Sequence, residues 1–123
     1  MTNHPAVVAL QKACKGLLFP SESEAKLEPF LWTNGNTLTQ ARLLDLSGSP
    51  KNTPIEEMTL DSLFRVVPKE ERPPFDKLAK VLQEQLSTIK VYKLGEQPEK
   101  QVFIVGKTTD GQWAGLKTTV VET

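Results

Sequence analysis

The chain has 123 residues, which suits one domain (residues 1–123) with a core of its own, and its fifteen basic and fifteen acidic side chains give a formal net charge of zero. This charge balance excludes the basic surface of a typical nucleic-acid-binding protein and an acidic surface that imitates nucleic acid as a whole. The one histidine, His4, lies at the extreme N-terminus with no second histidine and no cysteine cluster beside it, so neither a zinc site nor a Cys-His or Ser-His-Asp catalytic group is expected.

The first part of the chain predicts a helix followed by a strand. Apolar residues recur at spacings of three and four over residues 4–15, which is typical of an amphipathic helix, and Gly16 is placed to end it in the left-handed conformation. Cys14 lies on the apolar side of this pattern, so we expect a buried structural thiol and not a nucleophile. Within residues 27–33, residues 30–32 predict the first strand, with a closing turn at residues 34–36.

The middle of the chain has the weakest pattern until a long helix begins. Residues 39–46 fit a helix and a strand equally well, and we expect a short helix that ends at Ser47 and Gly48. Thr59 is a typical N-cap residue, which predicts a second brief helix. The prolines at 73 and 74 open the long helix, whose predicted apolar stripe comprises Phe75, Leu78, Ala79, Leu82, Leu86 and Ile89.

Three strands are expected to follow one another to the end of the chain. Residues 91–94 predict the first of them, and residues 102–105 form an unbroken apolar run, so both faces of that strand should be covered. The pair Asp110 and Gly111 predicts the hairpin turn into the last strand. In that strand we expect Ala114, Leu116, Thr118 and Val120 on one face, with Lys117 and Thr119 on the other.

Together these elements predict an α+β fold. The three consecutive strands and the strand at residues 30–32 would make a four-stranded, mainly antiparallel sheet. Helices on both faces would give an α-β-α sandwich. Neither an export signal nor a membrane span is apparent, so we expect a cytoplasmic protein without a membrane partner.

Two short segments are candidates for a functional site. Ser21, Glu22, Ser23 and Glu24 place two carboxylates in a predicted loop. Glu122 and Thr123 follow the last predicted strand directly, so we expect the carboxylate of Thr123 on a rigid element. The loop can equally be a solvated turn or a helix cap, and the terminus can be frayed and without function. Acid-base catalysis by paired carboxylates would need a cleft, which the sequence does not indicate.

Five segments of the chain resemble the nuclease A inhibitor family in their order, spacing and end point: residues 16–24, 30–32, 91–96, 102–106 and 115–123. The resemblance implies a small cytoplasmic, monomeric α-β-α sandwich that binds and blocks a sugar-nonspecific, magnesium-dependent nuclease. It implies neither catalysis, nor a cofactor, nor direct binding of nucleic acid. Glu22 matches the essential loop glutamate of the family, and Thr123 matches its terminal threonine, which reaches the metal centre of the nuclease. Ser21, Ser23, Glu24 and Glu122 would complete the partner-binding surface.

The implied mechanism agrees with the chemistry of a nuclease site, which presents arginines and a hard divalent cation that both favour anionic oxygen atoms. The chain departs from the family pattern in residues 69–74, where an aromatic contact to the enzyme is missing. Weaker affinity or another nuclease would follow, because aromatic anchors often dominate an interface. The alternatives are an adaptor of the same fold with a different partner and, less favoured, an enzyme, for which no nucleophile-base pair is present.

Overall fold

The computed structural model describes residues 4–19, 25–32, 39–96 and 98–121. In this part of the chain the fold is mixed α+β, as expected, and none of its helices is long and apolar enough to cross a membrane. The elements in chain order are α1 (Pro5–Cys14), β1 (Leu18–Phe19), β2 (Ala25–Lys26), β3 (Glu28–Trp32), α2 (Gln40–Ser47), β4 (Ile55–Met58), α3 (Leu60–Phe64), the 3₁₀ helix η1 (Lys69–Glu71), α4 (Arg72–Gln85), β5 (Ser87–Leu94), β6 (Glu99–Lys107) and β7 (Trp113–Val121).

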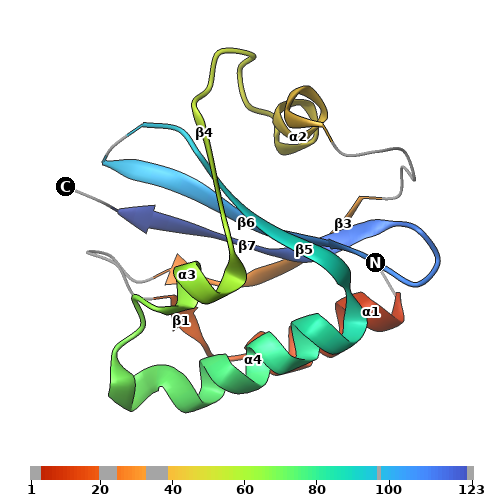
Figure 1. Ribbon diagram of the computed structural model, residues 1–123, viewed down its shortest axis with the longest axis vertical. Coiled ribbons are helices and arrows are strands. Elements are labelled where there is room, and N and C mark those ends of the chain that lie inside the picture. Colours follow the sequence, from red (N-terminus) through yellow and green to blue (C-terminus); the bar gives the residue numbers. More distant parts are fainter. Residues whose placement is uncertain (1–3, 20–24, 33–38, 97, 122–123) are drawn as a thin grey trace.

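The main sheet has five strands in the order β3-β7-β6-β5-β4, and every neighbouring pair is antiparallel (Figure 1). Strands β5, β6 and β7 form the expected meander, and β3 joins β7 with Phe30 opposite Gly115. The predicted number of four strands is wrong, because β4 adds a fifth strand beside β5. Strands β1 and β2 form a separate two-stranded sheet, which the sequence also did not predict.

Strand β4 escapes a pattern-based prediction because it lies at the edge of the sheet and two of its four residues are charged. Its glutamates are held by neighbouring lysines: the Oε1 atom of Glu57 lies 3.3 Å from Nζ of Lys90, and the Oε1 atom of Glu56 lies 3.6 Å from Nζ of Lys100. Cross-strand pairs of opposite charge stabilise such a strand without apolar alternation.

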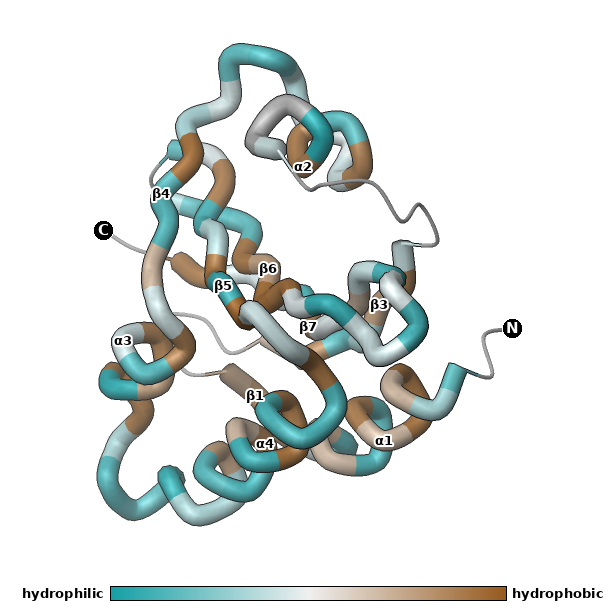
Figure 2. Tube along the Cα trace, turned by 45° about the vertical axis from the view of Figure 1, so that its right-hand side comes forward, coloured by the Kyte–Doolittle hydropathy of each residue, from teal (hydrophilic) through white to brown (hydrophobic). Residues whose placement is uncertain are grey.

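Helices α1, α3 and α4 lie on one side of the sheet and α2 lies on the other (Figures 1 and 2). Of the apolar run in β6, Val102 and Ile104 pack into the larger core with α1, α3 and α4, and are fully buried. Phe103 and Val105, which alternate with them along β6, face the α2 side. There they belong to the second cluster, which consists of Leu43, Leu44, Tyr92, Leu94, Phe103 and Val105. Both faces of β6 are therefore covered, as its sequence predicted.

The predicted helices are present, with one correction. Helix α2 begins after Thr39, whose hydroxyl accepts a hydrogen bond from the N–H group of Arg42, and ends at Gly48 with φ +74°. Helix α4, however, ends at Gln85, and Ile89 belongs to β5. The apolar spacing continues past the end of α4 because Leu86, the C-cap residue, and Ile89, in β5, still pack against the larger core.

The last hairpin forms where Asp110 and Gly111 predicted it. Gly111 adopts φ +84°, a conformation that favours glycine. The N–H group of Thr108 donates to the carbonyl oxygen of Gln112 at 2.8 Å, so the loop is wider than a two-residue turn. In β7, Ala114, Leu116, Thr118 and Val120 are buried and Lys117 is exposed, which confirms the expected division of its two faces.

Candidate functional site

The six predicted binding residues lie outside the described part of the chain: Ser21, Glu22, Ser23, Glu24, Glu122 and Thr123. The structure does describe the residues that precede and follow them. Phe19 and Ala25 are the described residues on either side of the loop segment, and Val121 is the last described residue of β7. The geometry of the candidate site is therefore the geometry of these attachment points.

Strands β1 and β2 hold the two attachment points of residues 20–24 together. They pair antiparallel, with Phe19 opposite Ala25 and Leu18 opposite Lys26. Phe19 is only 1 % exposed, and its ring centroid lies 6.1 Å from that of Phe75 in an edge-on arrangement. An aromatic anchor and a short strand pair thus fix the point at which the loop leaves the core.

The attachment point of residues 122–123 is equally well held. Strand β7 pairs with β6 as far as Val121, which lies opposite Glu99. Val120 is buried, with 3 % of its surface exposed, and belongs to the larger core. The last described residues of the chain therefore belong to a paired strand.

The attachment points of residues 20–24 and of residues 122–123 lie at the same edge of the sheet. Strand β2 directly precedes β3, in which Glu28 lies opposite Lys117 of β7. Strand β2 therefore also contacts β7. Ala25 and Thr119 line the same open hollow of about 360 Å³. We call this region, formed by β2 and the end of β7, the β2–β7 edge.

The hollow at the β2–β7 edge is polar and carries both signs of charge. Lys26, Glu28 and Lys117 line it, and the Oε2 atom of Glu28 lies 3.9 Å from Nζ of Lys117. No cluster of histidine, cysteine, aspartate or glutamate that could hold a metal ion occurs among the described residues. The described side chains of this edge can exchange hydrogen bonds and charge contacts with a partner.

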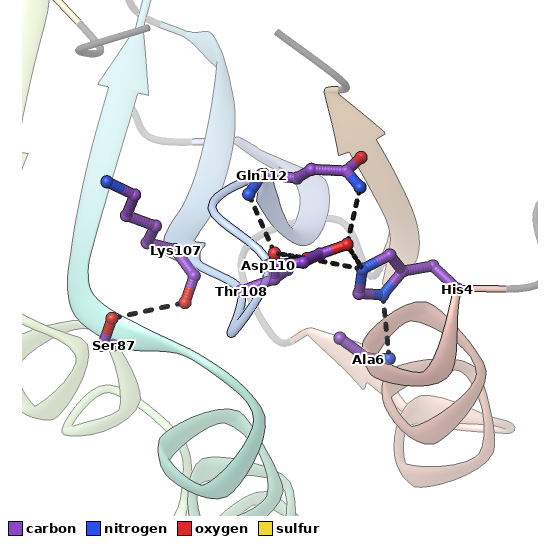
Figure 3. Close-up of polar contacts among 7 residues, drawn as sticks. All are labelled: His4, Ala6, Ser87, Lys107, Thr108, Asp110 and Gln112. Atoms are coloured by element: carbon purple, nitrogen blue, oxygen red, sulfur yellow. Dashed lines mark hydrogen bonds and ion pairs between the residues drawn. The ribbon is translucent and has the colours of Figure 1, made fainter. Parts of the chain in front are cut away.

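A second polar cluster, which the sequence analysis did not single out, joins the start of α1 to the β6–β7 loop (Figure 3). The Nε2 atom of His4 lies 2.9 and 3.1 Å from the two carboxylate oxygens of Asp110. The Nδ1 atom of His4 accepts a hydrogen bond from the N–H group of Ala6 at 3.1 Å, so the ring caps the helix and its Nε2–H group donates to Asp110. We call this contact the His4–Asp110 clasp.

The environment of Asp110 favours its charged form. The hydroxyl group of Thr108 donates to Asp110, and so do His4 and the side-chain N–H of Gln112 at 2.8 Å. These hydrogen bonds, that of Thr108 first, lower the pKa of Asp110 to about 2. A histidine at the start of a predicted helix and an aspartate in a predicted turn were visible in the sequence, but their contact was not, because the two residues are 106 positions apart.

Cys14 is buried, as expected, with 4 % of its surface exposed. Its thiol donates to the carbonyl oxygen of Leu27 at 3.5 Å, and burial raises its pKa. A thiol in this state is a poor nucleophile. The residue therefore packs α1 against the segment before β3.

The loop before α4 is charged and exposed. Arg72 orients it by donating from Nε to the carbonyl oxygen of Val67 at 3.1 Å and from Nη2 to that of Arg65 at 3.2 Å. Residues 69–74 carry no aromatic side chain that could extend from this surface. A contact made here would lack an aromatic anchor.

Comparison with known families gives a match over nearly the whole chain. The model of the family described as nuclease A inhibitor-like protein matches residues 4–123. A search of curated proteins finds no match. The family match covers every described element, including both strands of the β2–β7 edge, and the chain therefore belongs to the nuclease A inhibitor-like family.

Proposed function

We propose that this protein inhibits a sugar-nonspecific, magnesium-dependent nuclease by blocking its active site with Glu22 and Thr123. The match of residues 4–123 to the inhibitor-like family is the observation that carries the proposal. The convergence of β2 and the end of β7 supports it, because the segments that contain Glu22 and Thr123 are attached at the same edge.

The proposed mechanism is substitution of carboxylate for phosphate. A nuclease that cleaves phosphodiesters offers arginine side chains and a magnesium ion, and both bind anionic oxygen atoms. In the proposal, the Glu22 side chain and the Thr123 carboxylate occupy these positions, and Thr123 reaches the metal ion of the enzyme. Ser21, Ser23, Glu24 and Glu122 surround the two contacts. Attachment to paired strands keeps the entropy cost of binding low.

The proposal includes the remaining expectations from the family resemblance. We infer an α-β-α sandwich, which is supported by α2 on one side of the sheet and α1, α3 and α4 on the other. We further infer a cytoplasmic monomer without catalytic activity, without a cofactor and without direct affinity for nucleic acid.

The decisive experiment compares Glu22→Gln with Glu24→Gln in a titration of DNA cleavage by a purified nuclease of this class. The first variant removes the charge assigned to the enzyme site, and the second is its matched neighbour. Loss of one partner of a buried charge pair costs about 2–5 kcal/mol, so we expect Glu22→Gln to weaken inhibition by about 30-fold to several thousand-fold. Glu24→Gln should retain most of the inhibition.

Three results would contradict this proposal in different ways. Equal losses in the two variants would indicate a diffuse acidic patch. Binding to the nuclease without inhibition would favour an adaptor, and the absence of an aromatic residue in residues 69–74 is the feature that keeps this alternative open. Absence of both binding and inhibition, against several nucleases of the class, would leave only the fold.

A further inference from the structure

A groove runs between α1 and the segment formed by β1, β2 and the start of β3. Its volume is about 690 Å³, and it is open to solvent along one side. It is separate from the hollow at the β2–β7 edge, although Lys26 and Glu28 border both. We call it the α1 groove, and its lining includes Val8, Lys12, Lys15, Leu18, Lys26 and Pro29.

The apolar part of the α1 groove is exposed. Val8 is 36 % exposed and Leu18 is 42 % exposed, and both line the groove. Among the described residues, Val66 is the other large apolar side chain with this degree of exposure, and it lies elsewhere. A single exposed apolar residue needs no explanation, but two that line one groove form a contact surface.

The rim of the α1 groove is positively charged. Lys12, Lys15 and Lys26 are exposed and form no ion pair within residues 4–19, 25–32, 39–96 and 98–121. Lys12 and Lys15 lie at the C-terminal end of α1, where the helix dipole is negative. Lys26 belongs to β2 and is not at a helix end. Glu28, the acidic residue that borders the groove, is already paired with Lys117. Unpaired positive charge thus gathers here in a chain whose formal net charge is zero.

We propose that the α1 groove binds an acidic segment of a partner protein, with the lysines meeting its carboxylates and Val8 and Leu18 meeting its apolar side chains. Charge complementarity selects an acidic occupant. Pro29 has no backbone N–H group, which disfavours the addition of a further strand to β3, so the occupant is recognised by its side chains. This inference does not rest on the proposed inhibition of a nuclease.

The test uses a short fluorescein-labelled peptide of alternating leucine and aspartate, followed by fluorescence anisotropy. The comparison peptides carry lysine in place of aspartate or serine in place of leucine. We expect saturable binding of the leucine-aspartate peptide and at least about tenfold weaker binding of the other two. No saturable binding, or equal binding of the lysine peptide, overturns the proposal without the use of any variant.

Matched variants then locate the binding site. The triple change Lys12→Glu, Lys15→Glu and Lys26→Glu, and separately Leu18→Ser, should each weaken binding by about tenfold or more. The controls are Lys69→Glu, Lys77→Glu and Lys80→Glu together, which alter the net charge equally from exposed positions outside the groove, and Val66→Ser. Both controls should bind within about twofold of the parent.

Circular dichroism shows whether each variant is folded. If the triple variant is not folded, Leu18→Ser and the comparison of the three peptides test the proposal without it. Equal loss in the groove variants and in their controls overturns the proposal. Sedimentation with phosphatidylserine vesicles in place of peptide binding, lost in the lysine triple variant, would identify a membrane surface and also overturn it.

Discussion

Asp110 connects two distant parts of the chain through its carboxylate, which accepts hydrogen bonds from His4, Thr108 and Gln112. The Asp110 side chain is about half exposed, whereas the His4 side chain is 13 % exposed. The clasp therefore works at the protein surface, where its contribution depends on the protonation state of the carboxylate.

We expect this contribution to disappear in acid. The pKa of Asp110 is lowered to about 2 in the folded protein, against roughly 3.9 for an unperturbed aspartate. A lowered pKa gives stability that is present above the unfolded value and is lost as the pH falls through the folded value. The melting temperature of Asp110→Asn should lie below that of the parent at pH 6 and approach it near pH 2. Asp76→Asn, at an exposed position of α4, is the control, and a difference that persists at pH 2 would contradict the role assigned to the charge.

Gly115 is the residue at which a single methyl group should be least tolerated. A Cβ atom at this position would overlap the carbonyl oxygen of Ile104, which is backbone and cannot move aside. We expect Gly115→Ala to lower the free energy of unfolding by about 3 kcal/mol or more in urea denaturation. The control is Gly48→Ala, where space is open but φ is +74° and the cost should be only about 1–2 kcal/mol. Equal costs would mean that backbone conformation, and not contact with β6, governs both positions.

At the scale of elements, helix caps explain why the uncertain middle of the chain folds as it does. The hydroxyl oxygen of Thr59 accepts a hydrogen bond from the N–H group of Ser62 at 3.1 Å, which starts α3 directly after β4. Leu60, Leu63 and Phe64 of this short helix are buried. The cap thus positions a short helix whose apolar face is buried.

Removal of this cap should have a measurable cost. We expect Thr59→Ala to reduce the free energy of unfolding by about 1 kcal/mol, within the range of roughly 0.5–2 kcal/mol for such caps. Ser62→Ala is the matched control, because the backbone N–H group still reaches Thr59. Chemical denaturation followed by circular dichroism measures both, and a larger loss in the control would show that the contact between the two hydroxyl groups matters more than the cap.

The sequence predicted the elements whose signals are local. The cap at Thr59, the glycine at the end of α2 and the apolar run of β6 all led to correct elements. It missed β4, whose stability comes from β5 and from lysines on other strands, and it extended α4 because apolar spacing persists across Leu86. The candidate site was inferred from family resemblance, while the meeting of β2 and β7 required the three-dimensional register.

At the scale of the whole molecule, the His4–Asp110 clasp and the β2–β7 edge lie at opposite ends of β7. This strand has nine residues, so roughly 30 Å separates its start near the β6–β7 loop from its end at Val121. Changes at Asp110 should therefore affect stability and leave the proposed inhibitory edge in place. The α1 groove, in contrast, adjoins this edge through Lys26.

The proposed role of Thr123 leads to a test on the complete molecule. A short Gly-Ser extension after Thr123 keeps its side chain but moves the carboxylate away, so inhibition of the nuclease should weaken by about 30-fold to several thousand-fold. The melting temperature should not change, because stability effects outside the core are usually within about 0.5 kcal/mol. Deletion of Thr123 should have the same effect. Calorimetric titration that finds unchanged affinity for the extended chain would refute the carboxylate contact.

The position of β7 between β3 and β6 also sets the order in which the chain can fold during synthesis. Strand β3 leaves the ribosome early, but the strand that it pairs with in the main sheet follows more than eighty residues later, since Trp32 lies opposite Trp113. Throughout that delay the backbone of β3 lacks its sheet neighbour, and exposed strands of this kind pair readily with other nascent chains. Pro29, the second residue of β3, removes one of the donors that such a wrong pairing would use. The proline therefore protects the newly made chain during the interval before β7 arrives.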